Sequence, residues 1–176
     1  DLVQAMKSGK AVSFTYRSHF EEESHDVEME PYCLKFFKLR WYVIGRRTED
    51  GELRTYAIER MTGIEQTDRP FTIPDDFDGE AYFSNYFGVT ASGKPERIVL
   101  KAIDLEAKYI RSLPLHHSQR EIETGKGDAV FELFLAPTWD FRQELLSRGD
   151  QIEVLEPSEL REWMKGMTGK MLSKYL

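Results

Sequence analysis

Apolar and polar positions alternate along the first third of the chain. In residues 11–18, "AVSFTYRS", apolar side chains recur at every second position, which predicts a half-buried strand. The same period of two recurs in three further segments, residues 27–37, 39–47 and 54–65. Asp50-Gly51 predicts a tight turn between the last two segments, and a short helix over residues 1–8 is expected to end near Gly9. Short antiparallel strands joined by tight turns predict a small barrel or a strongly bent sheet.

The pattern changes after residue 72. Residues 73–95 read as a connector, but their tyrosines and phenylalanines predict a short helix that packs on one of the domains. Residues 96–176 alternate between strand and helix patterns in the order βαββαβ, followed by a last helix, which is typical of a ferredoxin-like domain. In the first of these helices, with Asp104 as N-cap, we expect Leu105, Tyr109 and Ile110 to lie along one face. The predicted fold class is α+β, with domains over residues 1–72 and 96–176 and a connector over 73–95.

Composition and charge narrow the possible classes of protein. The chain has 176 residues and a net charge of −7, which argues against sequence-independent DNA binding by this chain. It contains no run of about 18 apolar residues and no signal peptide, and its single cysteine, Cys33, cannot form an internal disulfide. These features favour a cytoplasmic protein. Because the sequence begins at Asp1 rather than Met, we expect it to be a piece of a longer protein.

The sequence offers little support for catalysis. None of the four histidines lies in a recognisable serine or cysteine nucleophile motif, and zinc signatures such as CxxC or HExxH are absent. The Gly-rich "GKGD" lacks the spacing and the Lys-Ser/Thr end of a phosphate-binding P-loop. We therefore predict no catalytic residue, no metal site and no cofactor.

An aromatic and basic cluster remains as the candidate site. Period two places Arg40, Tyr42 and Arg46 on one face of the segment "LRWYVIGRR" and Trp41 and Val43 on the other. The following segment places Arg54, Tyr56, Ile58 and Arg60 on one face, and Tyr16 lies on the earlier strand. Arginines bind phosphates with a planar fork and aromatic rings stack on bases, so this combination predicts an anion or nucleic-acid site. The alternative is that the aromatic side chains form a barrel core and the arginines only aid solubility. We expect Trp41 and Ile58 to be such core residues.

These segments resemble the WYL domain. The naming Trp-Tyr-Leu triplet is similar to Trp41-Tyr42-Val43, and the Arg-x-aromatic-x-aliphatic-x-Arg strand of the family corresponds to residues 54–60. The later stretch "LLSRGDQIEVLEPSELREWM" resembles the C-terminal extension that accompanies WYL domains. Together these motifs cover nearly the whole chain.

The resemblance implies a fold and a role. WYL domains are similar to SH3-like or Sm-like barrels and follow a winged helix-turn-helix in bacterial transcription regulators, where they are thought to sense nucleotides or single-stranded nucleic acid. The implied ligand-binding residues are Tyr16, Arg17, Arg40, Tyr42, Arg46, Arg54, Tyr56 and Arg60. We also expect a homodimer, no enzymatic activity, and DNA contact through a helix-turn-helix that lies outside this sequence. A structural dimerisation module without a ligand, or an enzyme acting on nucleotides, are the alternatives.

Overall fold

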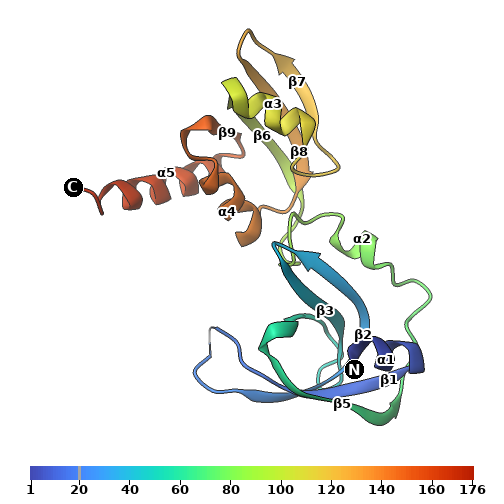
Figure 1. Cartoon of the computed structure of the whole chain (residues 1–176). Coiled ribbons are helices and arrows are strands. Elements are labelled where there is room, and N and C mark those ends of the chain that lie inside the picture. Colours follow the sequence, from blue (N-terminus) through green and yellow to red (C-terminus); the bar gives the residue numbers. More distant parts are fainter. Residues whose placement is uncertain (20) are drawn as a thin grey trace. The chain divides into compact units, whose positions relative to one another are not determined.

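A computed structural model describes residues 1–19 and 21–176, and the chain divides into two units, Asp1–Gly79 and Glu80–Leu176 (Figure 1). Each unit combines helices with one antiparallel sheet, so the predicted α+β class is confirmed. Among the described residues, no helix is both long and apolar enough to cross a membrane.

The first unit follows the predicted order of elements. It contains α1 (Leu2–Ser8), β1 (Lys10–Tyr16), β2 (His25–Phe37), β3 (Arg40–Arg47), β4 (Leu53–Ala57), the 3₁₀ turn η1 (Ile58–Arg60) and β5 (Met61–Pro70). Helix α1 ends where predicted, because Gly9 adopts a left-handed φ of 60° and its N–H bonds the carbonyl groups of Ala5 and Met6. Gly51 likewise has a positive φ of 74° in the β3–β4 turn.

The five strands form a sheet in the order β4-β3-β2-β1-β5. In the part of the chain that the structure describes, β4 and β5 do not pair, so the expected closed barrel is not formed. The reason is local: η1 ends β4 at Ala57, and the chain then returns as β5 to pair with β1. The predicted continuous strand over residues 54–65 is therefore two strands joined by a turn.

One face of this sheet, here called the inner face, carries the core of the first unit. Phe14, Tyr16 and Tyr56 pack edge to face, with ring centroids 4.9 Å apart for the two tyrosines and 5.3 Å apart for Phe14 and Tyr56. Helix α1 adds Leu2 and Ala5 to the same cluster. Each aromatic pair of this geometry contributes about 0.5–1.5 kcal/mol beyond the burial of its area.

The other face, here called the outer face, is covered partly by the segment that follows β5. Tyr32 stacks on Phe71 with centroids 6.0 Å apart and meets Phe77 edge to face at 5.0 Å. Ile44 is fully buried although it does not belong to the inner-face core. The sheet is thus apolar on both faces, and each face has its own contribution to stability.

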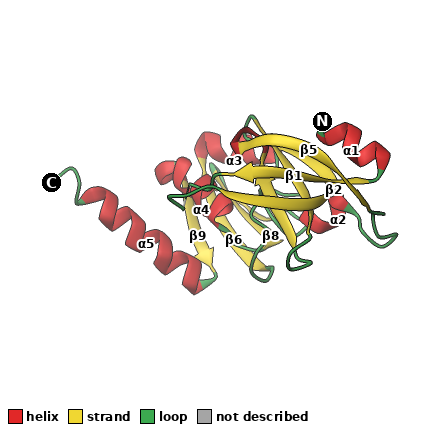
Figure 2. Cartoon of the chain, turned by 90° about the horizontal axis from the view of Figure 1, so that it is seen from below, coloured by secondary structure: helices red, strands yellow, loops and turns green. Residues whose placement is uncertain are grey.

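The second unit also has the predicted order of elements. It contains β6 (Glu96–Ile103), α3 (Asp104–Ser112), β7 (Arg120–Thr124), β8 (Asp128–Leu135), α4 (Trp139–Ser147), the 3₁₀ turn η2 (Gly149–Gln151), β9 (Ile152–Glu156) and α5 (Ser158–Leu172), with α2 (Gly79–Phe83) before them. The sheet order is β7-β8-β6-β9, and every neighbouring pair is antiparallel. Its core is built from one face of the sheet together with α3, α4 and the start of α5. Figures 1 and 2 show α5 extending away from the sheet of its own unit.

The expected face of α3 is wrong in part. Ile110 is buried together with Ala107, whereas Leu105 and Tyr109 are 61% and 62% exposed. Residues 107 and 110 are three apart and share a helix face, while 105 and 109 form a second face four apart. The sheet covers only the first of these faces. Asp104 is also not the N-cap but the first helical residue, with a positive φ of 49°.

Candidate functional site

The eight predicted ligand residues are divided between the two faces of the first sheet. Residues directly opposite one another on neighbouring strands share a face, and the register pairs Tyr56 with Val43 and Arg54 with Gly45. Tyr56, Arg54 and Tyr16 therefore belong to the inner face, and Arg40, Tyr42 and Arg46 to the outer face. The expectation that the arginines and tyrosines of β3 and β4 form one shared face is thus wrong. A shift of one residue in the pairing register exchanges the faces of a strand.

The outer-face arginines are engaged in ion pairs. Arg46 Nε and Nη2 lie 2.9 and 2.8 Å from Glu30 Oε2, and the Tyr32 hydroxyl donates to the same oxygen at 3.2 Å. Glu30 is only 4% exposed, so Arg46 neutralises a buried carboxylate. Burial and then Glu30 raise the pKa of Tyr32. Arg40 pairs with Glu59 at 2.8 Å. These contacts give both arginines a structural role.

The inner-face tyrosines are part of the core. Tyr16 and Tyr56 are 8% and 6% exposed, and their rings are packed edge to face on each other and on Phe14. The Tyr16 hydroxyl accepts a hydrogen bond from the Ala57 N–H at 3.4 Å. Burial, the largest influence, raises the pKa of Tyr56 even though Arg47 and Arg54 act to lower it. Little ring surface is therefore exposed for base stacking, and ligand binding by Tyr16 and Tyr56 stays a prediction.

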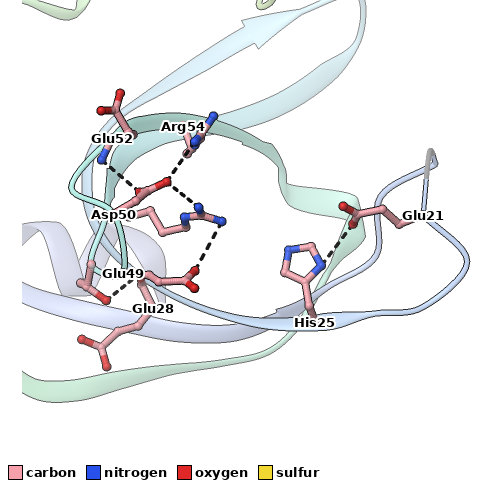
Figure 3. Close-up of polar contacts among 9 residues, drawn as sticks. Glu21, His25, Glu28, Glu49, Asp50, Glu52 and Arg54 are labelled. Atoms are coloured by element: carbon pink, nitrogen blue, oxygen red, sulfur yellow. Dashed lines mark hydrogen bonds and ion pairs between the residues drawn. The ribbon is translucent and has the colours of Figure 1, made fainter.

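Arg47 is a basic residue of the inner face that the sequence interpretation missed. It lies opposite Met29, and its guanidinium contacts the carboxylate of Asp50, which also accepts from Arg54 Nη2 at 2.9 Å. Figure 3 shows Asp50 reaching Arg54 from the β3–β4 turn while the Glu52 N–H donates to its other oxygen. These donors hold the pKa of Asp50 far below its usual range. The sequence could have predicted this, because period two places Arg47 on the same face of the strand as Val43.

Arg17 and Arg60 form a second basic pair beside Tyr16. The backbone N–H of Arg17 donates to the Arg60 carbonyl at 3.3 Å, so the two residues are neighbours just beyond the β1–β5 ladder. Within residues 1–19 and 21–176 neither guanidinium has a partner, and Arg60 Nε is buried without a hydrogen-bond acceptor. Ten other arginines of the described chain contact a carboxylate, and the remaining one, Arg142, donates to the Pro137 carbonyl. Arg17 and Arg60 are thus set apart from all the other arginines.

Trp41 and Ile58 do not share the core position expected for both. Ile58 packs against the inner-face core. Trp41 lies on the same face of β3 as Val43 but at the β2–β3 hairpin end, where it is 52% exposed and contacts Phe36 with ring centroids 5.1 Å apart.

Cys33 is half-buried on β2, and burial raises the pKa of its thiol. In the described part of the chain no group of three His, Cys, Asp or Glu side chains is placed to hold a metal ion.

Comparisons with known proteins find distant relatives of this chain. The curated relative Protein PafB of Mycobacterium leprae is 24% identical over 164 residues, which is 92% of this chain and 49% of that protein. The chain thus spans about half the length of this relative.

Two solved structures are similar to the chain. A CRISPR Cas-related protein has a TM-score of 0.58 at 16% identity, covering 99% of this chain and 50% of that one, which shows a likeness of fold. Proteasome accessory factor B/C of Arthrobacter aurescens gives a TM-score of 0.46 at 22% identity, covering 93% of this chain and 25% of that one.

Two protein families match in sequence. Residues 1–66 match the WYL domain and residues 94–172 match the WCX domain. The chain therefore contains a WYL domain followed by a WCX domain.

Proposed function

We propose that this chain is the ligand-sensing module of a bacterial helix-turn-helix transcription regulator, and that it binds an anionic ligand on the first unit. The ligand class is a nucleotide or a single-stranded nucleic acid. The WYL domain supports the regulatory role. Arg17 and Arg60, which are neighbours just beyond the β1–β5 ladder, support the anionic ligand.

The observation that carries the proposal is the unpartnered pair Arg17 and Arg60. An arginine without a counter-charge is costly when part of its guanidinium is buried, as Arg60 Nε is. An oxyanion that accepts from both side chains would remove this cost and gain charge-assisted hydrogen bonds. The ligand therefore supplies the carboxylate or phosphate that the fold itself does not.

Arg47 and Arg54 are proposed as further contacts, on the inner face. Tyr56 is close enough to both arginines for their charges to oppose the burial that raises its pKa, and its ring contacts that of Tyr16. Asp50 occupies Arg47 and Arg54 in the absence of ligand, so a second phosphate would have to compete with this carboxylate. Of the eight residues predicted from the sequence, we retain Arg17, Arg54 and Arg60 as direct contacts and add Arg47.

A binding experiment tests this proposal. Short single-stranded DNA and cyclic dinucleotides are titrated into the whole chain at low and moderate salt, with Arg17→Ala and Arg60→Ala variants in parallel. Each variant loses one phosphate contact, which should reduce the magnitude of the slope of log affinity against log salt by about 0.7 for single strands.

The matched control is Arg40→Ala, which removes an outer-face arginine that pairs with Glu59. We expect this variant to bind like the parent chain. If neither ligand class binds, or if Arg40→Ala and Arg60→Ala weaken binding equally, the proposed site is wrong. Product analysis with nucleotides checks the enzyme alternative, which we do not favour.

The finer architecture is part of the same proposal. We infer an SH3-like or Sm-like relation for the first unit, supported by its sequential sheet in which β5 returns to β1. We infer a ferredoxin-like arrangement for the second unit, supported by the order β7-β8-β6-β9 and the chain order βαββαβ. We also propose domains over residues 1–72 and 96–176 with a connector over 73–95, supported by the family matches over 1–66 and 94–172.

Signal transmission requires a second element of the proposal. A ligand changes DNA affinity only if it binds two arrangements of the regulator with different affinities. We propose that these are two arrangements of a homodimer in the cytoplasm, with DNA contacted by a helix-turn-helix outside this sequence. Sedimentation of the chain with and without single-stranded DNA measures whether the ligand changes the monomer–dimer equilibrium.

A further inference from the structure

The first turn of α4 leaves its backbone donors unused. Helix α4 starts at Trp139, and the N–H groups of Trp139, Asp140 and Phe141 have no acceptor among the described residues. A helix start carries a partial positive charge in addition to these free donors. By itself this is a general property of helices, so a specific site needs further features.

Thr138 supplies such a feature. It is the N-cap residue of α4, a position where the side-chain oxygen usually accepts from the second or third backbone N–H of the helix. Here that hydrogen bond is absent, Thr138 is 7% exposed, and its Oγ1 is buried without a partner. The hydroxyl and the neighbouring amides are therefore unsatisfied side by side. One oxyanion could accept hydrogen bonds from both.

A cavity lies at this helix start. Its lining includes Ser92, Lys94, Glu96, Thr138, Trp139 and Arg142. Lys94 has no partner among the described residues. Arg142 is held in place, because its Nε donates to the Pro137 carbonyl at 2.8 Å and its guanidinium lies 5.0 Å above the Trp163 ring.

The acidic groups of this region do not cancel the positive charge. Asp140, in the first turn of α4, accepts the N–H groups of Val89 and Thr90 at 2.9 and 2.8 Å, so its carboxylate is already engaged. Glu96 is the carboxylate that lines the cavity beside Lys94 and Arg142. The lining thus carries two cations and one anion, together with the free amides of the helix.

We propose that this cavity in the second unit binds the oxyanion group, phosphate or carboxylate, of a small ligand. Thr138 Oγ1 and the first-turn amides would donate to the oxyanion, and Lys94 would neutralise it. Glu96 would favour a ligand that has a hydroxyl or ammonium donor next to its anionic group, and would disfavour a bare, highly charged anion. The site is independent of the arginine site proposed for the first unit.

Phosphate and acetate titrations of the whole chain test the proposal. Sodium phosphate or sodium acetate is added at constant ionic strength, with sodium chloride as the reference, and the backbone amide signals of residues 138–141 are followed by NMR. Trp139 fluorescence is a second readout, because this side chain is 58% exposed and lines the cavity. Saturable shifts with one or both oxyanions, and not with chloride, support the site and show which anion it prefers.

Three variants sharpen the test. Thr138→Val keeps the shape and removes the hydroxyl, Thr138→Ser restores it, and Lys94→Met removes the cation. We expect affinity to fall about tenfold for Val and Met, as for loss of one hydrogen bond to a charged group, and to be retained for Ser. The matched control, Lys101→Met, removes a lysine that pairs with Asp128 at 2.6 Å outside the cavity, and should bind normally.

The proposal is overturned by either of two results. One is the lack of a saturable response to both oxyanions beyond that to chloride. The other is equal affinity in Lys94→Met and the parent chain. If Thr138→Val does not fold, as judged by circular dichroism, the Lys94→Met result still tests the proposal, because the Lys94 side chain is exposed at the surface.

Discussion

Replacing Arg46 by methionine should destabilise the first unit without affecting ligand binding. Arg46→Met keeps much of the aliphatic length. It removes the hydrogen bond from Nε to Glu30 Oε2, at 2.9 Å, and the ion-pair contact of Nη2 with the same oxygen, at 2.8 Å. Glu30 is 4% exposed and would retain only the Tyr32 hydroxyl, at 3.2 Å. The variant therefore leaves a buried carboxylate without a counter-charge.

The magnitude follows from how far the pair is buried. Breaking a fully buried ion pair costs about 3–5 kcal/mol, whereas exposed pairs contribute about 0–1 kcal/mol. The Arg46 side chain is 46% exposed and Glu30 nearly buried, so screening from one side reduces the cost. We expect the free energy of unfolding to fall by about 2 kcal/mol. The double variant Glu30→Gln, Arg46→Met should recover part of this loss, because a neutral amide needs no counter-charge.

Urea unfolding of the whole chain measures the loss, and native-state hydrogen exchange of β3 amides assigns it to the first unit. Arg54→Met is the matched control, since its partner Asp50 lies in an exposed turn, and it should be indistinguishable from the parent chain in stability. A loss below about 0.5 kcal/mol for Arg46→Met, the median of an exposed pair, would refute the structural role of this arginine. Loss of oligonucleotide binding in Arg46→Met, with the chain still folded, would also refute it.

Three further outcomes are expected. Asp50→Asn removes the carboxylate that occupies two inner-face arginines, so single-stranded DNA should bind about tenfold tighter in a titration, the gain expected from one freed charged contact. Gly45→Ala should cost about 3 kcal/mol in urea unfolding, because the added Cβ would lie 2.1 Å from the Glu30 carbonyl oxygen. Arg111 lowers the pKa of Glu121 to about 2. The ionised carboxylate therefore stabilises the folded state above the pKa that the group has in the unfolded chain, and this stabilisation is lost as the pH falls towards 2. Melting curves between pH 5 and 2 should therefore show a smaller decline in Glu121→Gln than in the parent chain.

The local pattern determined the elements of this protein. Alternation of apolar and polar residues indicated the strands of the first unit, and Gly9 and Asp50-Gly51 marked a helix end and a turn that the structure contains. The order βαββαβ with a last helix was also readable, because each of those elements has its own period and its own end signals. These features depend on neighbours within a few residues.

The use of the arginines was decided by tertiary structure. Period two shows which residues of a strand share a face, but the pairing register decides which faces of two strands coincide. The register separated Arg54 from Arg46, and the partner that occupies Arg46 is Glu30, 16 positions earlier in the chain. Among the described residues, Arg60 Nε is buried without an acceptor.

The sequence by itself determined most of the secondary structure, the family resemblance and the kinds of side chain available for an anion site. Only the tertiary structure decided which arginines stabilise the fold and which remain available to a ligand. The physical reason is that an ion pair depends on the distance between side chains that lie far apart in the sequence, and that distance is set by strand register and burial.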